Sequence, residues 1–295
     1  MAFCSFFCTF AAYFTTKIMM KAKKVLFITQ EITPYVPETA MSLIGRQLPQ
    51  AIQEKGKEIR TFMPKWGNIN ERRNQLHEVI RLSGMNLIID DTDHPLIIKV
   101  ASIQSARMQV YFIDNDDYFQ QRLMASDEEG KEYSDNDERT IFYARGVLET
   151  VKKLRWCPDI IHCHGWMTSL VPLYVKTAYK EEPSFRDSKI IFSLYENGFQ
   201  ANFNENFLNQ TIIKDMKPEM LQGINQPVNF EELTKLAINY SDGIIQNAPD
   251  TNPALLQYAE EKGLPILPYQ GEKDYADAFN AFYDTVWDNS QEETK

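Results

Sequence analysis

The stretch Pro158-Asp159-Ile160-Ile161-His162-Cys163-His164-Gly165-Trp166 decides the fold. Its apolar run predicts a buried strand that ends in polar residues and a glycine, and an amphipathic segment follows over 167–179. A buried strand that runs directly into a turn and a helix is the repeating unit of an α/β sheet. Ligands bind outside the carboxyl ends of the parallel strands in such sheets, so we expect His164 and Trp166 at the ligand-binding edge.

Neighbouring segments have the same character. Residues 25–29 and 189–194 form continuous apolar runs, as expected for parallel strands that are covered on both faces. A helical pattern begins at Ala40 and ends before Gly56, and a further strand over 58–63 completes a right-handed βαβ unit. We therefore predict a single Rossmann-like, doubly wound α/β domain with a mostly parallel sheet.

The segment 77–113 departs from this pattern. Three short apolar runs, over 79–82, 96–100 and 109–113, alternate there with polar turns. No helix of useful length fits between them, which predicts a β-rich excursion from the core. An acidic surface loop over 114–139 leads into a long helix over 137–154. The remaining elements are predicted as helices over 230–240, 252–262 and 273–287 and as strands over 242–246 and 264–267.

Composition restricts the class of protein. The chain has 295 residues, 43% of them hydrophobic, which is enough for one large α/β domain. The net charge of −10, without a strong basic cluster, argues against nucleic-acid binding. Cys157 and Cys163 are too far apart along one extended strand to pair, so we expect reduced thiols and a cytoplasmic protein. No CxxC or HxxxH spacing occurs, and we expect neither a metal nor a cofactor.

The chain ends are expected to lie outside the domain. Residues 1–20 are apolar, lack the basic start of a signal peptide and are short for a membrane span, so we expect no membrane association. Met20 directly precedes a basic run and the first strand. Either translation starts at Met20 instead of Met1 and residues 1–20 are a non-structural extension, or the segment is cleaved or anchoring. The domain is predicted over 21–289, with a polar tail over 290–295.

In their order and spacing, several motifs resemble a known family. They are residues 25–31 with Pro34, Leu48-Pro49, Tyr133-Ser134-Asp135-Asn136, Arg139, the 158–166 stretch, Phe199-Gln200 and Tyr240–Ile244. The resemblance is to the N-terminal domain of bacterial glycogen synthases and plant starch synthases, the GT5-type glucosyltransferases, and it extends from Lys24 to about Glu261. It implies the N-terminal half of a GT-B fold, and a family reaction in which glucose is transferred from ADP-glucose to an α-1,4-glucan with retention of configuration.

Several features depart from the family pattern. The family's Lys-x-Gly-Gly-Leu motif, whose lysine meets the donor phosphates, is replaced by Pro37-Glu38-Thr39-Ala40-Met41. The family's His-Asp-Trp becomes His164-Gly165-Trp166, and its later His-Asn pair becomes Tyr195-Glu196. The residues that follow the match are too few for the family's second domain, which supplies most of the donor site, so we expect that domain to be missing.

These departures bear on activity. A pyrophosphate leaving group must be neutralised by lysine, arginine, a metal or a helix N-terminus, and Glu38 would repel it. We expect a pseudoenzyme with impaired or no activity of its own, and the alternative is a non-catalytic glucan-binding or synthase-associated regulatory protein. The expected partners are an α-glucan or maltooligosaccharide, weakly bound ADP-glucose, and a full-length synthase or a second copy. A hydrolase and a dinucleotide-dependent oxidoreductase are disfavoured because GxSxG and GxGxxG motifs do not occur.

Seven residues are candidates for a glycan or nucleotide-sugar cleft: His164, Trp166, Tyr195, Glu196, Gln200, Asp135 and Asn136. Structural roles stay open for some of them, because Trp166 could be a packing anchor and Asp135 and Asn136 could cap the long helix. His162, inside the strand, is predicted to be a hydrogen-bonded core residue, and Asp159 a local cap at the opposite edge.

The closing helix over 273–287 has an aromatic face formed by Phe279, Phe282, Tyr283 and Trp287. We expect it to pack back onto the layer formed by residues 25–30 and 40–55.

Overall fold

The computed structural model describes residues 22–196, 198–271 and 273–293. The predicted extension over 1–20 lies outside these ranges. Among the described residues, no helix combines the length and the apolar composition needed to cross a membrane.

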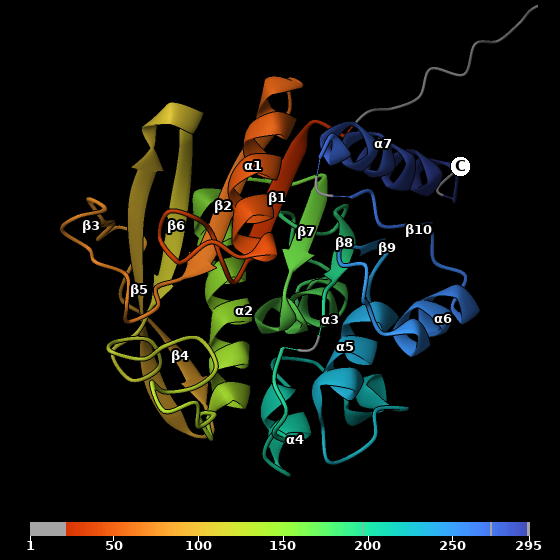
Figure 1. Ribbon diagram of the computed structural model, residues 1–295. Coiled ribbons are helices and arrows are strands. Elements are labelled where there is room, and N and C mark those ends of the chain that lie inside the picture. The colour runs from red at the N-terminus through yellow and green to blue at the C-terminus, as the bar shows by residue number, and fades with distance from the viewer. Residues whose placement is uncertain (1–21, 197, 272, 294–295) are drawn as a thin grey trace, which may run out of the picture.

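A mixed sheet forms the centre of the domain, with strand order β10-β9-β8-β7-β1-β2-β6-β5-β3 (Figure 1). All pairs from β10 to β6 are parallel, which confirms the predicted doubly wound α/β fold. The strands are β1 (Lys24–Thr29), β2 (Glu58–Pro64), β3 (His77–Glu78), β4 (Met85–Ile89), β5 (Thr92–Ile103), β6 (Met108–Asp114), β7 (Ile160–His164), β8 (Lys189–Leu194), β9 (Gly243–Gln246) and β10 (Ile266–Leu267).

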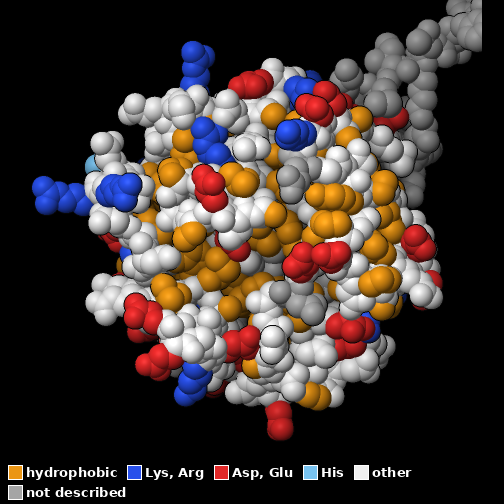
Figure 2. All heavy atoms as spheres, viewed as in Figure 1, with side chains coloured by type: hydrophobic (Ala, Val, Ile, Leu, Met, Phe, Trp, Pro, Cys, Tyr) orange, Lys and Arg blue, Asp and Glu red, His pale blue; other side chains and the backbone are white. Residues whose placement is uncertain are grey.

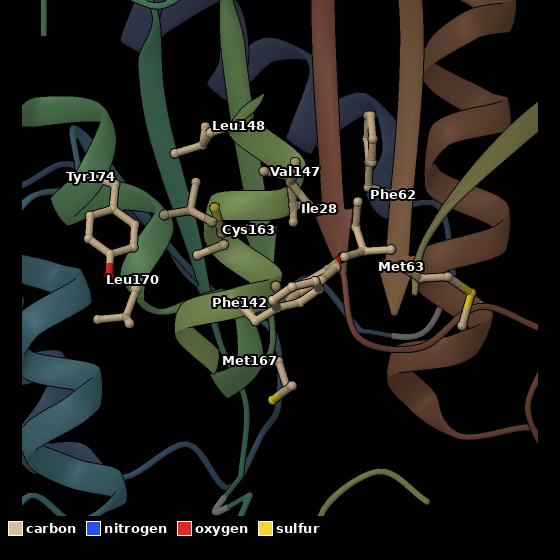
Figure 3. Close-up of a cluster of buried hydrophobic side chains, with 14 of the residues drawn as sticks. Ile28, Phe62, Met63, Phe142, Val147, Leu148, Cys163, Met167, Leu170 and Tyr174 are labelled. Atoms are coloured by element: carbon tan, nitrogen blue, oxygen red, sulfur yellow. The ribbon is translucent and has the colours of Figure 1, made fainter. Parts of the chain in front are cut away.

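Helices cover both faces of the sheet. They are α1 (Ala40–Glu54), α2 (Asn136–Leu154), α3 (Leu170–Lys176), α4 (Phe207–Thr211), α5 (Phe230–Asn239), α6 (Pro253–Glu261) and α7 (Tyr275–Glu293). The larger core lies between the sheet and the layer of α2, α3 and α5, where Ile28 and Cys163 meet Phe142 and Leu170 (Figure 3). Because side chains alternate along a strand, Val25 and Phe27 face the opposite layer of α1 and α7.

The closing helix packs where the sequence predicts. Phe279 and Tyr283 of α7 belong to the same buried cluster as Phe27 of β1 and Ile52 of α1. A buried ion pair between Lys57 and the α7 residue Asp284, 2.6 Å between Nζ and Oδ1, adds a polar tie. The helix runs to Glu293, so residues 290–293, expected in the polar tail, continue it.

The β-rich excursion is present, but two of its boundaries differ from the prediction. The apolar run 79–82 is a turn, in which the Leu82 amide donates to the Val79 carbonyl. The strand in this region is β3, which ends at Glu78, before the apolar run begins. Residues 109–113 belong to β6, which pairs with β2 in parallel and therefore lies inside the main sheet. β4 was not predicted, although its exposed and buried residues alternate as in a half-buried strand.

Candidate functional site

A cavity of about 360 Å³ opens at the carboxyl edge of the sheet. Its walls come from the loop after β1, the start of α1, the ends of β7 and β8, and α5. Figure 2 shows hydrophobic side chains gathered in the middle of the face seen in Figure 1. The lining residues are Gln30, Glu31, Thr39, Ala40, Met41, Met124, Gly165, Trp166, Phe192, Ser193, Leu194, Tyr195, Glu196, Gly198, Phe230, Thr234 and Ala248. The ligand edge predicted from the sequence is thus a hollow surface.

Glu31 and the first turn of α1 form one wall. Thr39 is the N-cap of α1, and its Oγ1 accepts a hydrogen bond from the Ser42 amide while donating to Glu31 Oε2 at 2.5 Å. The Glu31 side chain is nearly buried, and its carboxylate lies close to the positive end of the helix dipole. The chain therefore supplies its own anion at the helix terminus where a phosphate could otherwise bind.

Gly165 and Gln30 form the floor where the resemblance led us to expect an aspartate. Gly165 has φ +85° and ψ 162°, a region that is essentially restricted to glycine. A Cβ atom at this position would lie 2.4 Å from Oε1 of Gln30. The Gln30 carboxamide thus occupies the space into which a side chain at 165 would point.

His164 lies behind the cavity wall and does not line it. Its side chain is 1% exposed, and Nδ1 is 2.8 Å from the hydroxyl of Tyr195, which does line the cavity. Asn247 Nδ2 donates to the same hydroxyl, so the tyrosine proton is directed to His164. Burial lowers the pKa of His164 to about 3, and the imidazole is neutral. In this structure Tyr195 therefore lies between His164 and the cavity that His164 was expected to face.

His162 is a hydrogen-bonded core residue, as predicted. Its Nδ1 is 2.7 Å from the Tyr283 hydroxyl and its Nε2 is 2.7 Å from Ser193 Oγ. The rings of His162 and His164 are 3.8 Å apart between centroids. Burial, and secondly the neighbouring His164, hold the pKa of His162 well below its ordinary value.

Trp166 both packs and lines the cavity. It is 3% exposed and meets Phe199 edge to face at 5.0 Å between centroids. Glu196 is exposed at the rim of the cavity. Gln200 does not line the cavity, and its backbone amide donates to Glu132 Oε1 at 2.8 Å. Of the seven candidates, Trp166, Tyr195 and Glu196 are brought together at the cavity.

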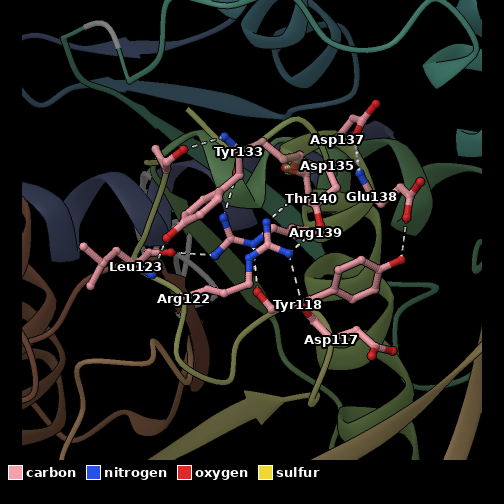
Figure 4. Close-up of polar contacts among 12 residues, drawn as sticks. Asp117, Tyr118, Arg122, Leu123, Tyr133, Asp135, Asp137, Glu138, Arg139 and Thr140 are labelled. Atoms are coloured by element: carbon pink, nitrogen blue, oxygen red, sulfur yellow. Dashed lines mark hydrogen bonds and ion pairs between the residues drawn. The ribbon is translucent and has the colours of Figure 1, made fainter. Parts of the chain in front are cut away.

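Asp135 belongs to a separate structural network with Arg122 and Arg139 (Figure 4), and Asn136 bonds to the same Arg139. Asp135 is at the N-cap position of α2 without a capping bond, and it pairs through both oxygens with Arg122 at 2.7 and 2.5 Å. Asn136 Oδ1 accepts from Arg139 at 2.7 Å, and its amide donates to the Ala125 carbonyl. Neither residue lines the cavity, and both order the loop that precedes α2.

Sequence reasoning missed Gln30, Glu31, Thr39 and Phe230 as wall residues. Gln30 and Glu31 directly follow β1, so their position at the carboxyl edge of a central strand was a usable signal. Glu38, which was expected to repel a phosphate, is exposed and does not line the cavity. The carboxylates that do line it are those of Glu31 and Glu196.

Comparison with known proteins shows the family to which the chain is similar. The family model described as "Starch synthase catalytic domain" matches residues 24–264. The glycogen synthase of Chlorobium limicola is 34% identical over 237 residues, covering 77% of this chain and 48% of that protein. The glycogen synthase of Chlorobaculum tepidum is 34% identical over 220 residues, covering 74% of this chain and 44% of that protein.

The fold is also similar to the catalytic domain of starch synthase IV from Arabidopsis thaliana, solved with bound ADP and acarbose. The TM-score is 0.66 at 18% identity, over 85% of this chain and 51% of the other. This likeness supports the GT-B-type fold. The chain spans about half the length of the curated relatives it matches. With its family-model match over 24–264, the chain belongs to the starch synthase catalytic domain family.

Proposed function

We propose that this domain keeps the scaffold of a glycogen or starch synthase-type glucosyltransferase but does not transfer glucose from ADP-glucose on its own. One observation carries the proposal. Among the described residues that line the cavity, Glu31 and Glu196 carry charge and none is lysine or arginine. Glucosyl transfer from a nucleotide-sugar needs positive groups that stabilise the departing pyrophosphate.

The electrostatic penalty for a donor phosphate in this cavity is large. A like charge about 4 Å from a phosphate oxygen costs about 4 kcal/mol at an effective dielectric constant of about 20. The N-terminus of α1 does not compensate, because Glu31 already lies there and accepts the Thr39 hydroxyl. His164 does not compensate either, since it is neutral and shielded by Tyr195.

The cavity suits a neutral sugar better than a nucleotide diphosphate. Trp166 and Phe230 provide apolar wall, and binding sites for small molecules are generally apolar with a few polar groups. We therefore propose an α-glucan or maltooligosaccharide as the ligand, with ADP-glucose weak at best. The same features favour the non-catalytic alternative, in which the protein binds glucan or associates with a full-length synthase or a second copy. The unpaired state of Cys157 and Cys163 supports a cytoplasmic location as part of this proposal.

The test compares turnover with binding. Purified protein is incubated with ADP-glucose and maltoheptaose, and ADP release is measured beside the glycogen synthase of Chlorobium limicola as a positive control. Glucan binding is measured by retardation in a native gel that contains glycogen. We expect background ADP release together with retardation. Turnover well above background would overturn the proposal, and the absence of both turnover and retardation would leave the protein–protein role.

A further inference from the structure

We propose that the cavity binds a cationic small molecule of monosaccharide size, of the class of amine-bearing sugars. The inference rests on the proposed function, because a cavity that stabilised a pyrophosphate would not select a cation. The cavity volume of about 360 Å³ is within the ~300–1,000 Å³ usual for small-molecule sites. The class of ligand follows from which hydrogen-bonding groups of the wall are already engaged within the protein.

The hydroxyl groups of the wall already form hydrogen bonds within the protein. Thr39 Oγ1 donates to Glu31, and Thr234 Oγ1 donates to the Phe230 carbonyl at 2.7 Å. The Tyr195 hydroxyl is bonded to His164. The fourth hydroxyl, on Ser193, is bonded to His162. A ligand that needs donors from the protein therefore finds the hydroxyls of the described wall occupied.

Two hydrogen-bond acceptors in the same wall have only long hydrogen bonds to the rest of the described protein. Glu31 is 8% exposed, and the only partner among the described residues for its Oε1 is Gln30 Nε2 at 3.3 Å. Gln30 is 4% exposed, and within the described part of the chain its Oε1 accepts a hydrogen bond only from the Met167 amide, at 3.4 Å. Both distances are beyond the usual range for N–H···O bonds, and a nearly buried acceptor with a weak bond leaves free energy to be gained. An ammonium group has three donors and no acceptor, so it matches this surplus.

Charge and aromatic surface point to the same class of ligand. Glu31 in the wall and Glu196 at the rim give the cavity two carboxylates, without a lining lysine or arginine among the described residues. Charge-assisted bonds from an ammonium to a carboxylate are shorter and stronger than neutral ones. Trp166 and Phe230 line the cavity as well, and aromatic side chains beside carboxylates are a recurrent composition of sites for organic ammonium ions.

Isothermal titration calorimetry with matched sugars tests the inference. The probes are D-glucosamine, its neutral derivative N-acetyl-D-glucosamine, D-glucose and α-D-glucose 1-phosphate, all at one ionic strength. We expect glucosamine to bind at least about tenfold more tightly than glucose, and glucose 1-phosphate more weakly than glucose. Glucosamine binding should weaken with added salt and when the pH is raised past the pKa of its amine.

Variants separate this site from surface charge. Glu196→Gln, at an exposed position of the rim, should reduce glucosamine affinity several-fold and glucose affinity by a smaller factor, while Glu181→Gln, an exposed residue away from the cavity, should change neither. Equal binding of glucosamine and its N-acetyl derivative, preference for glucose 1-phosphate, or no glucosamine binding would each overturn the inference. ADP release from ADP-glucose is measured on the same preparation. Release refutes the proposed function, whereas failed glucosamine binding without release refutes only this inference.

Discussion

Replacing Gly165 by aspartate recreates the family's His-Asp-Trp sequence, and we expect it to destabilise the domain without returning a carboxylate to the cavity. Gly165 has φ +85° and ψ 162°, where a residue with a side chain is strained. The new Cβ atom would also lie 2.4 Å from Gln30 Oε1 and 2.5 Å from Gln30 Cδ. Gln30 is 4% exposed, and its carboxamide can give way only by turning toward the cavity that it lines.

The expected cost is the sum of two terms. A residue forced into a sparsely populated backbone region costs about 1–3 kcal/mol. Overpacking against the buried Gln30 side chain costs about another 1–3 kcal/mol. The free energy of unfolding should therefore fall by about 2–6 kcal/mol, a large share of the ~5–15 kcal/mol typical of a folded domain.

Urea denaturation followed by circular dichroism measures this cost. Gly165→Ala is the matched control, because it carries the same backbone strain and the same Cβ contact without the charge. A Gln30→Ala substitution should relieve only the overpacking, so the double-mutant cycle with Gly165→Asp should show about 1–3 kcal/mol of favourable coupling. An unchanged urea midpoint for Gly165→Ala would refute the reasoning, since neither strain nor overpacking would then be present.

Two further predictions concern stability. Asp284→Ala removes one partner of the buried pair with Lys57 and should lower the free energy of unfolding by about 3–5 kcal/mol. The control is Asp277→Ala, at an exposed α7 residue that also pairs with a lysine, which should lower it by less than about 1 kcal/mol. Equal urea midpoints for the two variants would contradict this prediction. The pKa values of His162 and His164 are depressed in the folded state, so the unfolded chain binds more protons below about pH 6.5. The free energy of unfolding should therefore fall as the pH falls, by up to about 1.4 kcal/mol per pH unit for each histidine. A His164→Asn variant should show about half of that slope, and a slope equal to that of the parent protein would contradict the prediction.

The sequence predicted the elements whose signal is local. β1, β7 and β8 were predicted because strands covered on both faces are apolar throughout. The membership of β6 in the main sheet was missed, because strand order depends on long-range pairing and leaves no mark in hydrophobic periodicity. The return of α7 onto β1 and α1 could be predicted, since its aromatic face needed a large apolar partner.

The site was predicted at the level of the sheet edge and not at the level of side chains. His162 and His164 are two residues apart in β7, so they point to the same face of the sheet, toward Phe27 and Tyr283. That periodicity alone would have placed both in one layer. The shielding of His164 by Tyr195 was beyond prediction, because it depends on the side-chain direction of a residue in another strand–loop junction.

The residues around the cavity are physically coupled, and this explains why the single substitution Gly165→Asp should not recreate a donor site. The absence of a side chain at 165 permits the positive φ, and Gln30 occupies the space where a Cβ atom would lie. Gln30 donates weakly to Glu31, which accepts from Thr39 and occupies the positive end of α1. A phosphate would have to displace that carboxylate. A cation needs no such displacement, because it adds a bond to acceptors that the protein leaves underused. The same contacts that disfavour an anionic donor therefore favour a cationic ligand.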